Sequence, residues 1–107
     1  MNAAPAIFVG AAVNNRAILD NCLRRSPDIA SGALPLAIFE GCASAGQAYN
    51  RALDAAPPGA LVVLAHQDVY LPAGFAERLR EQVARVEAIA PDWAVLAGLG
   101  LDGARRL

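Results

Sequence analysis

The chain has 107 residues and a net charge of −1, with 56% hydrophobic and 18% charged residues. This length suits a single domain, and the apolar content excludes an intrinsically disordered chain. The near-neutral charge provides no basic surface for nucleic acid, and no apolar run approaches the roughly 20 residues of a membrane span. Because the N-terminus also lacks the basic start of a secretory signal, we expect a cytoplasmic protein.

The first part of the chain predicts one strand followed by one helix. The apolar run 6–12 is typical of a buried strand. Asn14 or Asn15 can then cap a helix, whose apolar stripe extends to Leu23. The turn-rich stretch 26–35 connects this unit to the next one.

The rest of the chain repeats the same alternation. Residues 36–40 predict a second strand, and 44–56 place apolar side chains at helical spacing before a Pro-Pro-Gly stop. Residues 60–65 are apolar on both faces, which indicates a central parallel strand. A helix is expected over 72–90 and a fourth strand over 93–101.

Strands that alternate with amphipathic helices predict an α/β fold, a mostly parallel sheet of about four strands with flanking helices. Ligands of such sheets bind beyond the carboxyl ends of the strands. Three polar clusters fall at that edge. They are Asn14 with Asn15, then Glu40, and the run His66-Gln67-Asp68.

Several familiar kinds of site are excluded by the motifs. The sequence contains no Gly-rich dinucleotide fingerprint, no P-loop and no nucleophile elbow. A single histidine leaves a zinc hydrolase short of ligands. Cys22 and Cys42 stand far apart with no CxxC pairing, so we expect free buried thiols rather than a disulfide or a zinc site.

The carboxylate of Asp68 is open to two interpretations. A carboxylate at a strand exit can hold Mg²⁺ or Mn²⁺ on a diphosphate, because these cations accept one protein carboxylate and take phosphate and water oxygens for the remainder. Asp68 can equally shape the turn toward Pro72 by accepting backbone hydrogen bonds. His66 can likewise contact a ligand, or it can be a polar side chain at the edge of the sheet whose hydrogen bonds are satisfied within the protein.

The segment 44–75 resembles the donor half of family 2 glycosyltransferases with the GT-A fold. Gly46 and Asn50 match the helix signature of that family, and Asp68 matches the last acid of its metal-binding motif. The variant His-Gln-Asp-Val is similar to a bacterial subgroup linked to streptomycin-type biosynthesis or capsule sugars. The resemblance implies a Rossmann-like N-terminal half of a GT-A fold, in which Asn50 braces its helix against the site.

The resemblance also implies roles for individual residues. Asp68 would reach Mg²⁺ or Mn²⁺ and the diphosphate of a nucleotide-sugar donor. Glu40 would lie near the nucleobase or ribose, and Gln67 beside the ligand. His66 replaces the first acid of the motif, which weakens the metal site or directs the imidazole to a phosphate oxygen. The loop flanking the nucleotide would be formed by Ala12, Val13 and Asn14.

The family places its acceptor site and catalytic base after the fourth strand, where this sequence stops. We therefore expect residues 1–107 to form one nucleotide-sugar-binding domain, truncated at its C-terminus. A homodimer or another partner would cover the exposed sheet edge. The function indicated is sugar transfer to an acceptor hydroxyl. The alternatives are a non-catalytic nucleotide-sugar-binding module and a plain α/β interaction domain.

Overall fold

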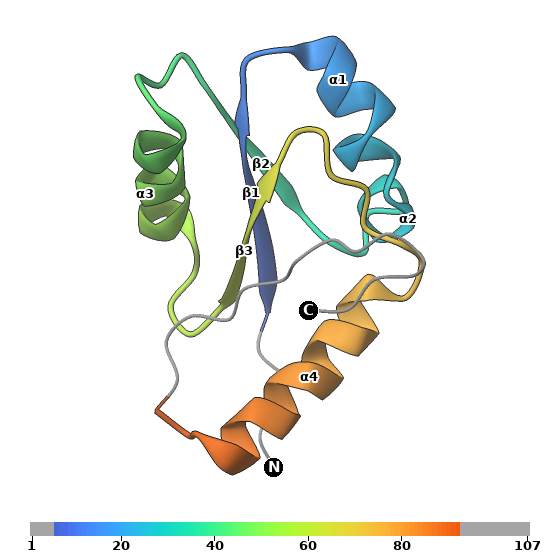
Figure 1. Ribbon diagram of the computed structural model, residues 1–107, viewed down its shortest axis with the longest axis vertical. Coiled ribbons are helices and arrows are strands. Elements are labelled where there is room, and N and C mark those ends of the chain that lie inside the picture. Colours follow the sequence, from blue (N-terminus) through green and yellow to red (C-terminus); the bar gives the residue numbers. More distant parts are fainter. Residues whose placement is uncertain (1–5, 93–107) are drawn as a thin grey trace, which may run out of the picture.

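The computed structural model describes residues 6–92, in which strands and helices alternate (Figure 1). The strands are β1 (Ile7–Val13), β2 (Leu36–Glu40) and β3 (Leu61–His66). The helices are α1 (Arg16–Asn21), the 3₁₀ turn η1 (Leu23–Arg25), α2 (Pro27–Ala30), α3 (Ala45–Ala55) and α4 (Phe75–Ile89). The predicted α/β class is therefore confirmed.

The three strands form a parallel sheet in the order β2-β1-β3. In the register of β1 with its neighbours, Val13 lies opposite Glu40 and Ala12 lies opposite His66. The chain steps from β1 to β2 in one direction and then crosses to β3 on the other side. The topological switch therefore lies between β1 and β3, and a ligand crevice is expected beyond the carboxyl ends of these two strands.

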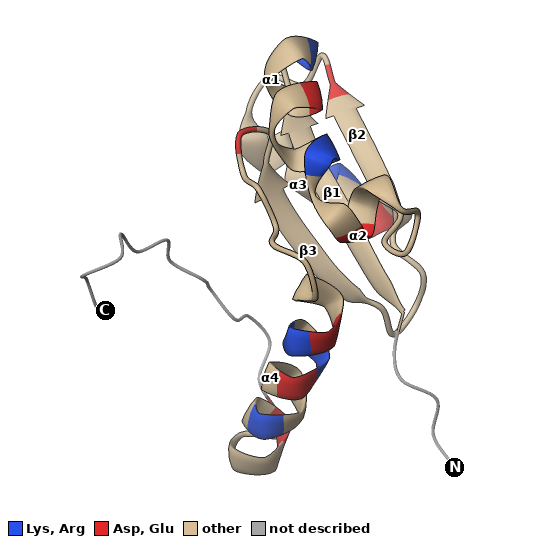
Figure 2. Ribbon diagram, turned by 90° about the vertical axis from the view of Figure 1, so that its right-hand side faces the viewer, with Lys and Arg blue, Asp and Glu red and all other residues tan. Residues whose placement is uncertain are grey.

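Helices lie on both faces of this sheet, with α3 on one side and α1 and α2 on the other, whereas α4 packs against the core only near its start and then projects beyond the sheet (Figures 1 and 2). This follows from the crossovers, because connections of one hand that run in opposite directions place their helices on opposite faces. The second face holds the main core. Its buried members from β1 are Ile7, Val9, Ala11 and Val13, and its buried members from the helices are Leu19, Leu23 and Ile29.

The face under α3 is packed with small residues. Ala48 and Ala52 of this helix are fully buried, and Gly10 of β1 lies beneath them. A Cβ atom at position 10 would stand only 2.6 Å from the Cβ of Ala52. Glycine is therefore required at this position by the close approach of helix and strand, since real Cβ atoms do not come that near.

The predicted elements match the structure with a few differences, and the short helix α2 was not predicted within the turn-rich stretch 26–35. The helix after β1 ends at Asn21 and is followed by η1. Helix α4 begins only after Gly74, which occupies the N-cap position with a φ of 81°. The strand predicted at 60–65 forms as β3, but β1 and not β3 is central among the described strands. The fourth strand predicted at 93–101 lies outside the described residues.

Hydrogen bonds fix the loop between β3 and α4 to the segment that contains η1 and α2. The carbonyl of Gln67 accepts from the N–H of Leu23 at 3.3 Å, and the fully buried Ser26 Oγ accepts from the N–H of Leu71 at 2.8 Å. The Asp28 carboxylate accepts from the N–H of Ala76, in the first turn of α4, at 2.9 Å. The loop that carries Asp68 is thus anchored at its beginning, middle and end.

Arginine and glutamate are interspersed along α4, so this helix presents charges of both signs (Figure 2). Within residues 6–92, no helix is long and apolar enough to span a bilayer. Cys22 and Cys42 are free thiols in the described part of the chain, but they are half-buried and not buried as expected.

Candidate functional site

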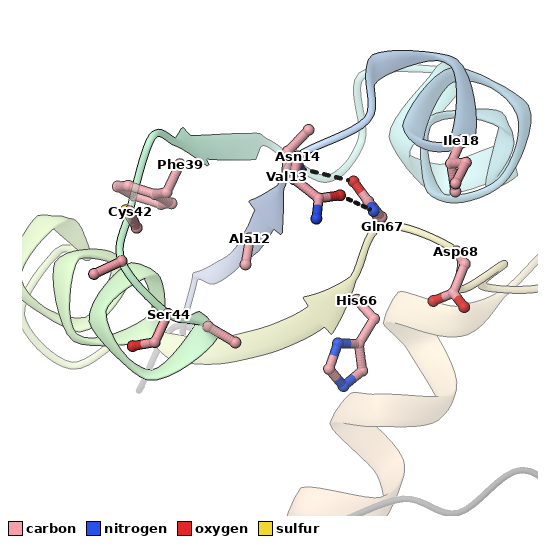
Figure 3. A pocket seen from close by; sticks show the side chains of 12 residues that line it. Ala12, Val13, Asn14, Ile18, Phe39, Cys42, Ser44, His66, Gln67 and Asp68 are labelled. Atoms are coloured by element: carbon pink, nitrogen blue, oxygen red, sulfur yellow. Dashed lines mark hydrogen bonds between the residues drawn. The ribbon is translucent and has the colours of Figure 1, made fainter.

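A pocket of about 430 Å³ opens at the carboxyl edge of the sheet, at the switch between β1 and β3 (Figure 3). Its walls come from the ends of these two strands, from the loop after β2 and from the first residue of α3. The lining residues are Ala12, Val13, Asn14, Ile18, Phe39, Cys42, Ala43, Ser44, Ala45, His66, Gln67 and Asp68.

The structure brings together all but one of the residues predicted for the site. Ala12, Val13 and Asn14 lie on the β1 side of the pocket, and the run His66-Gln67-Asp68 lies on the β3 side. Parallel pairing explains this convergence, because Ala12 and His66 are partners in the register and both strands end at the same edge. Glu40 is the exception and does not line the pocket.

Glu40 is instead paired with Arg16, the first residue of α1. The guanidinium Nη2 and Nε lie 2.6 and 3.0 Å from the two carboxylate oxygens, so the contact is bidentate. The hydrogen bond from Arg16 lowers the pKa of the Glu40 carboxyl, although both groups are exposed. This pair ties the end of β2 to the start of α1.

Gln67 connects the two strand exits. Its Oε1 accepts from the backbone N–H groups of Asn14 and Asn15 at 3.1 Å each, and its Nε2 donates to Asn14 Oδ1 at 2.6 Å. These hydrogen bonds hold the loop after β1, where Asn15 caps α1 by accepting from the N–H of Ile18. The side chain of Gln67 therefore faces Asn14, whereas its neighbours His66 and Asp68 project to the other side of the loop (Figure 3).

Asp68 presents an exposed carboxylate at the rim of the pocket. Across residues 6–92, no side-chain hydrogen bond or ion pair engages it. The turn toward Pro72 is held by other groups, such as Ser26 Oγ on the N–H of Leu71. Asp68 is thus available to a ligand or a cation on a loop that is anchored at both ends.

His66 ends β3 and leans against Tyr49 of α3. Its Nδ1 lies 3.3 Å from the Tyr49 hydroxyl, and the two rings meet edge to face with centroids 6.2 Å apart. The pKa of the Tyr49 phenol is raised, chiefly by burial and also by the negative charge of Asp68. At the β3 side of the pocket, Tyr49 therefore contacts His66 and lies close enough to Asp68 for its charge to affect the phenol.

The N-terminus of α3 forms part of the opposite wall. Ser44 caps this helix, since its Oγ accepts from the N–H of Gln47 at 3.1 Å, and Gln47 Oε1 in turn accepts from the N–H of Ala43. In the part of the chain that the structure describes, the N–H groups of Ala45 and Gly46 have no acceptor. Unpaired amides at a helix start favour an anionic group, because they carry partial positive charge.

Some lining residues were not predicted from the sequence. These are Ile18 of α1, Phe39 near the end of β2, and the residues Cys42, Ala43, Ser44 and Ala45 from the loop after β2 and the start of α3. The signal for the start of α3 was present in Ser44 and Gln47, whose spacing is typical of a helix cap. Asn50, expected to brace α3, is exposed and makes no side-chain hydrogen bond with the described residues.

The metal-binding atoms of the pocket suit a hard divalent cation only if a bound ligand supplies most of the oxygen atoms that coordinate the cation. Asp68 is the sole carboxylate among the described lining residues, and residues 6–92 contain no group of three metal-binding side chains. Mg²⁺ and Mn²⁺ can be held in this way, with phosphate and water oxygens completing the shell. Comparison with family models, curated proteins and solved structures finds no match to this chain.

Proposed function

We propose that this chain is a glycosyltransferase-like domain that binds a nucleotide-sugar donor in the pocket at the carboxyl edge of its sheet. The observation that carries the proposal is the exposed carboxylate of Asp68, which has no partner within residues 6–92, at the rim of a pocket located at a topological switch point. The volume of about 430 Å³ falls within the usual range of small-molecule sites. The resemblance of residues 44–75 to the donor half of family 2 glycosyltransferases supports the same assignment.

The polar groups of the pocket complement a cation-bound diphosphate. Asp68 provides the negative charge that a divalent cation requires. The backbone N–H groups at the start of α3, which have no acceptor among residues 6–92, provide hydrogen-bond donors for phosphate oxygens. Phe39 and Ile18 add apolar surface for the ring of a nucleobase or sugar. The N–H groups that would bind the phosphate oxygens and the carboxylate that would bind the cation thus lie on opposite walls of the pocket. A diphosphate with its bound cation would fit between them.

Asp68 would hold Mg²⁺ or Mn²⁺ together with the diphosphate. The cation would neutralise the charge that develops on the leaving nucleoside diphosphate during attack by an acceptor hydroxyl. The chain's own contribution is to bind and orient the donor, and the anchored loop keeps Asp68 in place for this role.

A non-catalytic nucleotide-sugar-binding module is the second candidate. It is favoured by one observation: besides Asp68, the described lining contains no carboxylate to deprotonate an acceptor. Both candidates predict donor binding, and only the first predicts turnover. Release of free sugar or nucleoside diphosphate therefore separates them.

The test is calorimetric titration of UDP-glucose and GDP-mannose in Mn²⁺, with parallel assays of donor hydrolysis. We expect Mn²⁺-dependent binding that Asp68→Asn weakens by about tenfold or more. Asp54→Asn, an exposed substitution at the other end of α3, serves as the matched control and should bind as the wild type does. Absence of binding to either nucleotide class, or equal binding by the Asp68 variant, would overturn the proposal.

A further inference from the structure

The contact between Tyr49 and His66 joins two elements that are distant in the sequence. Tyr49 is half-buried on α3, outside the pocket lining, whereas His66 is an exposed lining residue at the end of β3. The Nδ1 atom of the imidazole faces the phenol, at 3.3 Å from its hydroxyl, and the two rings pack edge to face. The second ring nitrogen, Nε2, has no partner among the described residues.

This contact decides which nitrogen of a neutral His66 carries the proton. If the phenol donates its O–H to Nδ1, the imidazole proton resides on Nε2. The reverse arrangement would leave a bare lone pair on Nε2. A neutral phenol is a better donor than acceptor, and an unprotonated imidazole nitrogen is a good acceptor, so the first arrangement is favoured. Burial and the negative charge of Asp68 both keep the Tyr49 phenol protonated by raising its pKa.

We propose that Tyr49 is a positioning residue for His66, which it holds in the tautomer that offers Nε2–H to an anionic oxygen of the ligand. Under this assignment His66 donates a hydrogen bond to a phosphate oxygen and is not a metal ligand, because a protonated ring nitrogen cannot bind a cation. His66 then donates a hydrogen bond to the diphosphate, and the carboxylate of Asp68, two residues further on, binds the cation of that diphosphate. The choice of ligand rests on the proposed function, whereas the tautomer does not.

The tautomer can be measured without any ligand. The chain contains one histidine, so nitrogen-15 NMR of its imidazole reports His66 alone. In mildly alkaline buffer we expect a protonated Nε2 and an unprotonated Nδ1 in the wild type, and a mixture of tautomers in Tyr49→Phe, which keeps the ring and removes the hydroxyl. Tyr70→Phe is the matched control, since Tyr70 is the only other tyrosine and lies outside the pocket. It should leave the wild-type pattern unchanged.

The consequence for binding is tested with inorganic pyrophosphate in Mg²⁺. We expect His66→Ala to weaken binding by about tenfold and Tyr49→Phe by about threefold. The double variant should bind no more weakly than His66→Ala, because Tyr49 acts only through the imidazole. Far-UV circular dichroism of each variant checks that the fold is retained.

The outcomes separate this inference from the proposed function. A proton on Nδ1 in the wild type, a tautomer unaffected by Tyr49→Phe, or additive losses in the double variant would each overturn the positioning role. If the wild type binds neither pyrophosphate nor nucleotide, the proposed function fails together with the assigned ligand. The NMR result still decides in that case whether Tyr49 sets the tautomer.

Discussion

Gln67 holds Asn14 by two hydrogen bonds, one that accepts from its backbone N–H at 3.1 Å and one that donates to its side-chain oxygen at 2.6 Å. Through them the exit of β3 is joined to the exit of the central strand β1, across the point where the pocket forms. The three polar residues at the end of β3, the run His66-Gln67-Asp68, therefore have different roles. Nε2 of His66 and the carboxylate of Asp68 have no partner among the described residues and lie at the rim of the pocket, whereas Gln67 holds the two sides of the pocket together.

The hydrogen bonds of Gln67 predict an order of stability for the wild type and two variants at this position. Gln67→Met keeps the length of the side chain but removes its hydrogen bonds, and should lower the free energy of unfolding by about 1–2 kcal/mol. Gln67→Glu should lose less, because a carboxylate still accepts from both backbone N–H groups and the Asn14 amide can turn to donate. Urea denaturation measures the order. Equal midpoints for the Met variant and the wild type would show that water replaces these bonds without loss.

The close approach of Gly10 and Ala52 gives a second prediction. In Gly10→Ala the new methyl group would collide with the Ala52 Cβ, so we expect a loss of about 1–3 kcal/mol. Ala52→Gly alone should cost about 1 kcal/mol as a glycine in a helix. The double variant should be more stable than the sum of the two losses implies, because removal of the Ala52 methyl group relieves the collision. Additive losses in urea denaturation would contradict this packing.

The alternation of the elements could be predicted from the sequence because it depends on local patterns. The run 36–40 was placed to the residue, and the pattern in 44–56 and the stop after it located α3. Strand order depends on contacts between distant residues, so the position of β1 between β2 and β3 among the described strands could not be predicted from the sequence. The apolar composition of β3 reflects cover by helices on both faces and does not reveal its number of neighbours.

The candidate site was predictable to the extent that it follows from topology. Parallel strands end at one edge, and this brought the residues after β1 and β3 together as expected. Side-chain partners were not predictable in the same way. The pairing of Glu40 with Arg16 spans 24 positions, and that of Gln67 with Asn14 spans 53. No local pattern encodes such contacts, so Glu40 and Gln67 were both assigned to the ligand.

The pair of Glu40 and Arg16 gives a prediction for the effect of pH on stability. The pKa of Glu40 is lowered in the folded chain, so its contribution to stability is present above the unfolded pKa of about 4.3 and is lost as the pH falls through the folded pKa. Wild type should therefore unfold at higher urea than Glu40→Gln at neutral pH, and the gap should close in acid. High salt should narrow the gap at neutral pH. A gap that stays constant down to about pH 3 would contradict the ion pair.

The final prediction concerns the ionisation of Tyr49 in the Tyr70→Phe background, where it is the only tyrosine. Its pKa is raised by burial and, to a smaller extent, by Asp68, so tyrosinate absorbance should appear above the ordinary value of about 10 seen after unfolding. The stability linked to this group is fully present below the unfolded pKa and is lost as the pH rises through the folded pKa.

Adding Asp68→Asn to this background distinguishes the two causes. The Tyr49 pKa should fall, because a nearby negative charge has been removed, but it should stay above the unfolded value, because burial is the larger cause. Asp54→Asn, at the far end of α3, provides the control and should leave the titration unchanged. If the Asp68 substitution also has no effect, the carboxylate does not face Tyr49. The polar cluster at the exit of β3 would then be looser than its geometry indicates.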